Sequence, residues 1–99
     1  VGKAKFFLVG DPTHQLTNNF GVHIPEEGLA LRGTFVIDPS GTIKTMEVHS
    51  NEIARDVKET VRKLKAAQYT AAHPGEVCPA KWEEGAKTLK PSIELVGKI

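Results

Sequence analysis

The most regular part of the chain is a hairpin pattern, Thr34-Phe-Val-Ile-Asp-Pro-Ser-Gly-Thr-Ile-Lys-Thr-Met-Glu-Val48. Two runs that favour β-strands, residues 34–37 and 43–48, flank Asp38-Pro-Ser-Gly41, where Pro and Gly occupy turn positions. The second run places polar and apolar side chains on both faces, a mixture typical of a strand at the edge of a sheet. We therefore expect a hairpin whose second strand is free to pair with another chain.

Working outward, the preceding residues predict a strand, a short helix and a loop. The apolar run Ala4–Val9, ended by Gly10-Asp-Pro12, is typical of a strand buried on both faces of a parallel sheet. Residues 13–20 favour a short helix that stops at Gly21. Residues 23–28 contain a proline and two acids, so we expect a loop there.

After the hairpin, the sequence predicts a long helix from about Glu52 to Gln68. Its apolar stripe consists of Ile53, Val57, Val61 and Leu64. Ser50 or Asn51 is the expected N-cap, and the charged residues of the opposite face are expected to be solvated.

The order strand, helix, hairpin and helix predicts an α/β chain, the second half of a thioredoxin-type fold. We expect residues 1–72 to be the C-terminal part of such a domain, and residues 73–99 to be a tail laid over it. Three strands alone would leave a sheet face and edge uncovered, so further strands are expected before Val1. That the chain starts at Val1 rather than at Met also favours a piece of a longer protein.

Composition excludes several classes of function. The 99 residues suit one soluble domain, with 39% apolar and 25% charged residues and a net charge of +1. This charge gives no strong attraction to nucleic acid or membranes, and no signal peptide or membrane-spanning run is evident. A single cysteine rules out an internal disulfide and fits a reducing compartment, so we expect a cytoplasmic protein.

Cys78 is the first candidate site. A redox thiol needs access, a favourable thiolate and mobility. Gly75 and Pro79 prevent regular structure around Cys78, and Lys81 supplies a positive charge, while Glu76 acts in the opposite direction. The alternative is a small, buried, unreactive cysteine, which an isolated cysteine more often is.

Arg32 is the second candidate, because it stands between Leu29-Ala-Leu31 and a strand and could direct its donors at an anion or thiolate. The competing interpretation is a surface ion pair with Glu26, Glu27 or Asp38. The histidines lack metal-ligand spacing and the glycines form no phosphate loop, so no metal or cofactor is expected.

Several motifs resemble the typical two-cysteine peroxiredoxins, in particular the bacterial enzymes that reduce alkyl hydroperoxides. The resemblance covers the whole chain but only the C-terminal half of that family's chain. The string Val-Cys-Pro-Ala-Lys-Trp82 within residues 75–85 is the most specific motif, and the others are Gly28–Gly41, Val9–Thr13, Asn19–Val22, Lys65–Tyr69 and Leu95–Ile99.

The resemblance implies a role for each candidate. Cys78 would be the resolving cysteine, which attacks the sulfenic acid of a partner subunit's peroxidatic cysteine to form an intersubunit disulfide. Arg32 would stabilise the peroxidatic thiolate and the peroxide. Strand 43–48 would pair across a homodimer, and segments 11–22 and 28–32 would lie near the contacts that join dimers into a ring, a decamer by expectation.

The family also implies hydrogen peroxide and organic hydroperoxides as substrates, and a flavoprotein disulfide reductase or a thioredoxin-like protein as electron donor. The segment with the peroxidatic cysteine is missing from these 99 residues, so we expect the piece alone to be inactive. A second possibility is a non-catalytic, truncated subunit that assembles with or modulates full-length peroxiredoxin.

Overall fold

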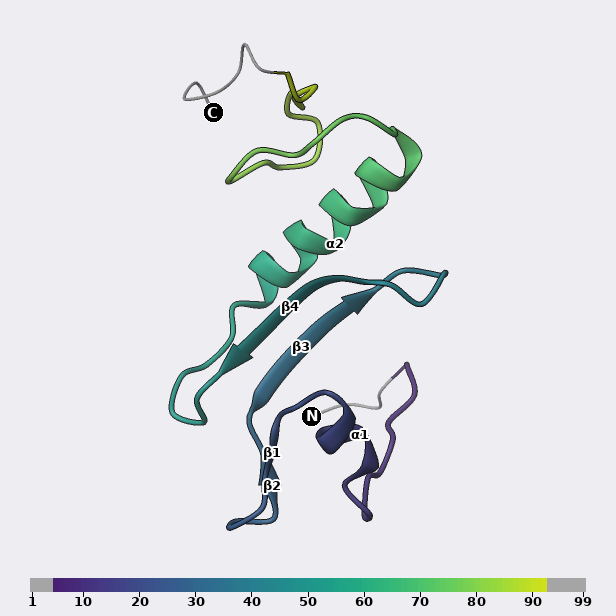
Figure 1. Ribbon diagram of the computed structural model, residues 1–99. Coiled ribbons are helices and arrows are strands. Elements are labelled where there is room, and N and C mark those ends of the chain that lie inside the picture. Colours follow the sequence, from purple (N-terminus) through teal and green to yellow (C-terminus); the bar gives the residue numbers. More distant parts are fainter. Residues whose placement is uncertain (1–4, 93–99) are drawn as a thin grey trace. The chain divides into compact units, whose positions relative to one another are not determined.

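The computed structural model describes residues 5–92, which divide into two compact units. The first unit contains residues up to Gly33 together with Val48–Ala54, and the second contains Thr34–Glu47 and the residues from Arg55 onward. Figure 1 labels the elements, which in chain order are α1 (Gln15–Asn19), β1 (His23–Ile24), β2 (Leu29–Ala30), β3 (Arg32–Ile37), β4 (Ile43–His49) and α2 (Val57–Ala72). The mixture of helices and hairpins agrees with the predicted α/β class.

The predicted hairpin is confirmed as the two-stranded sheet of β3 and β4 (Figure 1). Its turn is closed by the Asp38 N–H, which donates to the Thr42 carbonyl at 2.9 Å, and by Gly41, whose N–H donates to the Asp38 carbonyl. Gly41 has φ +89°, a conformation that L side chains rarely adopt. Along β4, Thr45 and Glu47 are half-buried whereas Met46 is 63% exposed. The two faces of β4 therefore differ in exposure, as expected for a strand at the edge of a sheet.

In the first unit, the short helix is confirmed and the expected loop is partly wrong. Asp11 begins α1 by accepting hydrogen bonds from the backbone N–H groups of Leu16 (3.1 Å) and Thr17 (3.0 Å). Residues 23–28 are not simply a loop, because His23 and Ile24 form β1, which pairs antiparallel with β2. The four residues 25–28 are enough to form the turn between these strands, so the residues on either side of the turn can pair.

The predicted strand over residues 4–9 is wrong for the part of it that the structure describes. Residues 5–9 form no strand, and Phe6 to Val9 are 72–96% exposed. A strand is stable only when its backbone groups pair with a neighbour. Within residues 5–92, no strand lies alongside this segment to provide those partners.

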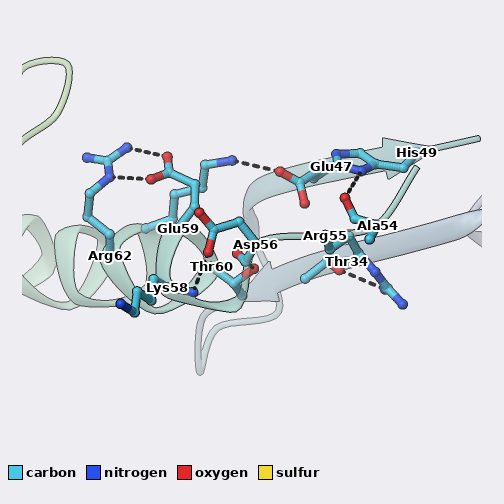
Figure 2. Close-up of polar contacts among 11 residues, drawn as sticks. Thr34, Glu47, His49, Ala54, Arg55, Asp56, Lys58, Glu59, Thr60 and Arg62 are labelled. Atoms are coloured by element: carbon cyan, nitrogen blue, oxygen red, sulfur yellow. Dashed lines mark hydrogen bonds and ion pairs between the residues drawn. The ribbon is translucent and has the colours of Figure 1, made fainter.

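Helix α2 is confirmed, but it begins later than predicted. Its N-cap is Asp56, whose carboxylate accepts a hydrogen bond from the Lys58 N–H at 3.0 Å (Figure 2), and not Ser50 or Asn51. Ser50 instead belongs to a preceding turn, in which its carbonyl accepts from the Ile53 N–H. Ile53 therefore lies before the helix and is not part of its apolar stripe.

In the second unit, polar contacts join the hairpin to α2 and to the residue just before its N-cap. Arg55, before the helix, donates to the Thr34 hydroxyl at 3.0 Å (Figure 2). Lys63 of α2 pairs with Glu47 of β4 at 3.3 Å. The tail folds back on itself through the bridge between Val77 and Leu89.

Trp82, at 3% exposed, is one of the two most buried apolar residues that the structure describes. The last part of the predicted tail, residues 93–99, lies outside the described residues. Within residues 5–92, no helix combines the length and apolar character that a bilayer span requires.

Candidate redox site at Cys78

Cys78 lies where the tail meets α2. Its thiol is half-buried and makes a weak hydrogen bond, 4.0 Å long, to the carbonyl of Ala66 in α2. A surface pocket of about 430 Å³ includes the thiol, with Lys44 and Lys63 among its lining residues. The candidate cysteine is thus neither free in a mobile loop nor sealed in a core.

Burial is the main influence on the protonation of Cys78. It raises the pKa of the thiol above its ordinary value of 9.0; the nearby charge of Arg62 lowers this pKa, and the carboxylate of Glu76 raises it. Cys78 therefore stays a neutral thiol at neutral pH while it remains in this position. The opposing effect of Glu76 agrees with the sequence analysis.

Arg62 is the cation that acts on this thiol, and sequence reasoning missed it by naming Lys81. Its guanidinium forms a two-pronged contact with the carboxylate of Glu59, with Nε and Nη2 donating at 2.8 and 2.7 Å (Figure 2). The third nitrogen, Nη1, donates to the backbone carbonyl of Trp82 at 3.0 Å. The contact with Glu59 raises the pKa of Arg62 and lowers that of Glu59. The only signal in the sequence was the three-residue spacing of Glu59 and Arg62, which we interpreted as part of a solvated face.

Glu76 fixes the other side of the Cys78 segment. Its Oε1 accepts hydrogen bonds from the hydroxyl of Thr88 and, at 3.2 Å, from the hydroxyl of Tyr69. These contacts, the Thr88 bond foremost, lower the pKa of the Glu76 carboxyl, so it is ionised at neutral pH. The ring of Tyr69 also contacts the Trp82 ring, with centroids 5.4 Å apart.

Arg32, the second predicted site residue, lies at the start of β3. Its side chain is exposed, and Nε donates to the backbone carbonyl of Asn51 at 2.8 Å. Among the described residues, none of the three predicted acidic partners forms an ion pair with it. Arg32 belongs to the first unit and Cys78 to the second.

The chemistry available at Cys78 is that of a single thiol. The 99 residues contain no second cysteine, so any disulfide of Cys78 must use a sulfur from elsewhere. Within the described part of the chain, no group of three or more His, Cys, Asp or Glu residues is arranged to hold a metal ion.

Comparison with known proteins identifies the relatives of this chain. The AhpC/TSA family model matches residues 2–46, and a model for the C-terminal domain of 1-Cys peroxiredoxin matches residues 66–98. Over all 99 residues, the chain is 85% identical to alkyl hydroperoxide reductase C of Pseudomonas aeruginosa and 58% identical to that of Salmonella typhimurium. It spans 53% of the length of each of these relatives.

Solved structures give the same result for the fold. The reduced 2-Cys peroxiredoxin of Plasmodium vivax matches 83% of this chain, with a TM-score of 0.76 and 32% identity, and the match covers 42% of that protein. AhpC of Enterococcus faecalis matches 70% of the chain, with a TM-score of 0.66 and 43% identity, over 41% of that protein. The predicted thioredoxin-like fold is therefore confirmed.

Proposed function

Because the chain belongs to the peroxiredoxin family, we propose that it is part of a thiol-dependent peroxidase that reduces hydrogen peroxide and organic hydroperoxides. The observation that carries this proposal is the 85% identity to alkyl hydroperoxide reductase C over the whole chain. The chain's only cysteine, Cys78, is the natural candidate for its redox chemistry. We assign it the role of resolving cysteine.

In this scheme the peroxidatic cysteine lies outside these 99 residues, on a partner subunit. Its thiolate takes one oxygen from the peroxide and becomes a sulfenic acid, while the peroxide is reduced to an alcohol or water. The sulfur of Cys78 then attacks that sulfenic sulfur. An S–S bond forms, the S–O bond breaks, and the hydroxide leaves as water with the proton of the Cys78 thiol.

Other parts of the proposal rest on the family resemblance and on local structure. Arg32 would stabilise the peroxidatic thiolate and the peroxide. Its guanidinium is exposed, and only Nε is used in the contact with Asn51, so the other N–H groups could donate to an anion. Strand β4, with Met46 and Val48 exposed, would pair across a homodimer, and dimers would form a ring, by expectation a decamer. A flavoprotein disulfide reductase or thioredoxin-like protein would return electrons in the cytoplasm.

The test is peroxide-driven crosslinking of the natural protein that contains this chain. Intact mass is measured under non-reducing, denaturing conditions, before and after one equivalent of peroxide. We expect a disulfide-linked dimer that disappears on reduction and does not form in Cys78→Ser. Thr70→Ser serves as the matched control, because it alters another side chain of the same pocket while leaving the thiol intact. Unchanged crosslinking and turnover in Cys78→Ser would refute the resolving role.

A non-catalytic role is the alternative, favoured by the single cysteine, which cannot complete a dithiol redox cycle by itself. In that case the 99-residue chain would join full-length subunits without consuming peroxide itself. Mixing the chain with a full-length relative distinguishes the catalytic role from the non-catalytic one. Co-assembly with unchanged peroxide consumption would support a subunit that has no part in catalysis.

A further inference from the structure

We propose that Arg62 is a positioning residue for Cys78: its contact with the Trp82 carbonyl holds the Cys78 turn closed against α2, and release of this contact limits how fast Cys78 reacts. We call this contact the Arg62 clasp. The inference deepens the proposed function, since it concerns the same thiol, but the clasp is a structural claim that is testable without peroxide.

The geometry of the guanidinium carries the first step. Glu59 occupies Nε and Nη2, and this two-pronged contact fixes the plane of the Arg62 fork (Figure 2). Nη1 is then directed at the Trp82 carbonyl, 20 residues away along the chain. A lysine has no fork and could not make both contacts in this way.

The position of Trp82 carries the second step. The Trp82 N–H donates to the Pro79 carbonyl at 3.1 Å, so residues 79–82 form one turn directly after Cys78. The clasp therefore anchors the far end of a turn whose near end, Pro79, directly follows the reactive residue. The Trp82 side chain is 3% exposed, and its indole N–H donates to the Ala86 carbonyl at 3.1 Å. The turn is thus held through both backbone and side chain.

The state of the thiol shows why this turn must open. A disulfide brings two sulfurs to about 2.05 Å, with a defined angle of approach. In the closed turn, Sγ of Cys78 is half-buried and directed at the Ala66 carbonyl. In this proposal, another protein's sulfur reaches bonding distance only when the turn is displaced, so the reaction rate includes the equilibrium for opening.

A second ion pair between α2 and the tail provides a control variant for Arg62. Lys65, three residues after Arg62 on α2, also pairs with the tail, through Glu84 at 3.3 Å. Both partners of that pair are well exposed, with side-chain exposures of 45% and 71%, so it should contribute little to closure. Lys65→Met thus removes the same charge from the same helix without loosening the turn.

The experiment measures the rate at which iodoacetamide alkylates Cys78 in the fully reduced natural protein, followed by mass spectrometry of the Cys78 peptide across a range of pH. We expect Arg62→Met to accelerate alkylation about fivefold to tenfold at every pH, the effect of one charge-assisted hydrogen bond at a partly exposed site. Arg62→Lys should also accelerate it, Glu59→Gln should do so less, and Lys65→Met should not change it. The global free energy of unfolding should fall by no more than the free energy of the local effect, since the closed state is the reference for both.

Two results would overturn the clasp. An unchanged rate in Arg62→Met would mean that its contact does not hold the turn. A slower rate in Arg62→Met, with the pH profile displaced upward and Arg62→Lys like the wild type, would mean that Arg62 acts only as a charge on the thiolate. Should Arg62→Met not fold, Arg62→Lys and Glu59→Gln still decide. Since no peroxide is used, failure of the resolving role in Cys78→Ser would leave this measurement valid.

Discussion

At the scale of single residues, Asp38 makes a pH-dependent contribution to the hairpin. Its Oδ1 accepts hydrogen bonds from the N–H and hydroxyl of Ser40, at 3.0 and 2.6 Å, and from the N–H of Thr42 at 2.9 Å. These bonds, the Ser40 hydroxyl first, lower the pKa of the Asp38 carboxyl below 3.8. A carboxyl whose pKa is lower in the folded than in the unfolded protein stabilises the folded protein at pH values above its unfolded pKa. This stabilisation is lost as the pH falls through the folded pKa.

We therefore expect Asp38→Ala to lower the free energy of unfolding at neutral pH, and the deficit to shrink below about pH 4. Asp38→Asn is the matched control: it keeps an oxygen acceptor but cannot titrate, so it should be milder and lack this pH dependence. Urea unfolding from pH 7 to acid checks both. If wild type and Asp38→Asn lose stability in parallel on acidification, the carboxylate is not responsible.

The candidate site shows what sequence reasoning at this scale could and could not find. Cys78 and the opposing charge of Glu76 were predictable because they are close in sequence. Arg62 was not, because its charge acts on the thiol only after the tail folds back on α2, and 16 residues separate the two in sequence. Lys81 was chosen for proximity along the chain, and the fold gives that role to a residue from another element.

At the scale of elements, the N-cap of α2 provides a direct test of where the helix begins. Asp56→Ala removes the acceptor for the Lys58 N–H and should cost about 1 kcal/mol of unfolding free energy, whereas Asp56→Ser should retain most of it. Asn51→Ala, at the position that the sequence favoured, should have almost no effect. Chemical denaturation measures all three. A larger loss for Asn51→Ala than for Asp56→Ala would restore the earlier helix start.

Local turn chemistry explains why the hairpin was predicted well and the helix start was not. Asp38 to Gly41 contain all the groups that close their own turn, so this signal needs no distant partner. The helix start was inferred from apolar spacing, which counted Ile53 because it fits the stripe. Spacing cannot distinguish a helical residue from one in a turn just before the helix, whereas a capping side chain can.

At the scale of the whole molecule, the exposed run Phe6–Val9 is the main departure from the prediction. An apolar strand cannot be stable without neighbours, and the described residues offer it none. The chain spans about half the length of its peroxiredoxin relatives. The same physical reasoning that predicted a buried strand therefore predicts that the remaining part of a peroxiredoxin would cover this run.

Phe7 tests that expectation, since it is 96% exposed in this structure. If the run stays exposed in the natural protein, Phe7→Ala should change the free energy of unfolding by less than about 0.5 kcal/mol. If the longer chain buries it as a central strand, the loss should be about 3 kcal/mol or more. We expect the second result, together with slow amide hydrogen exchange over residues 6–9. Lys5→Ala, at the polar end of the same segment, should be neutral in either case, and equal small effects for both variants would mean that the strand never forms.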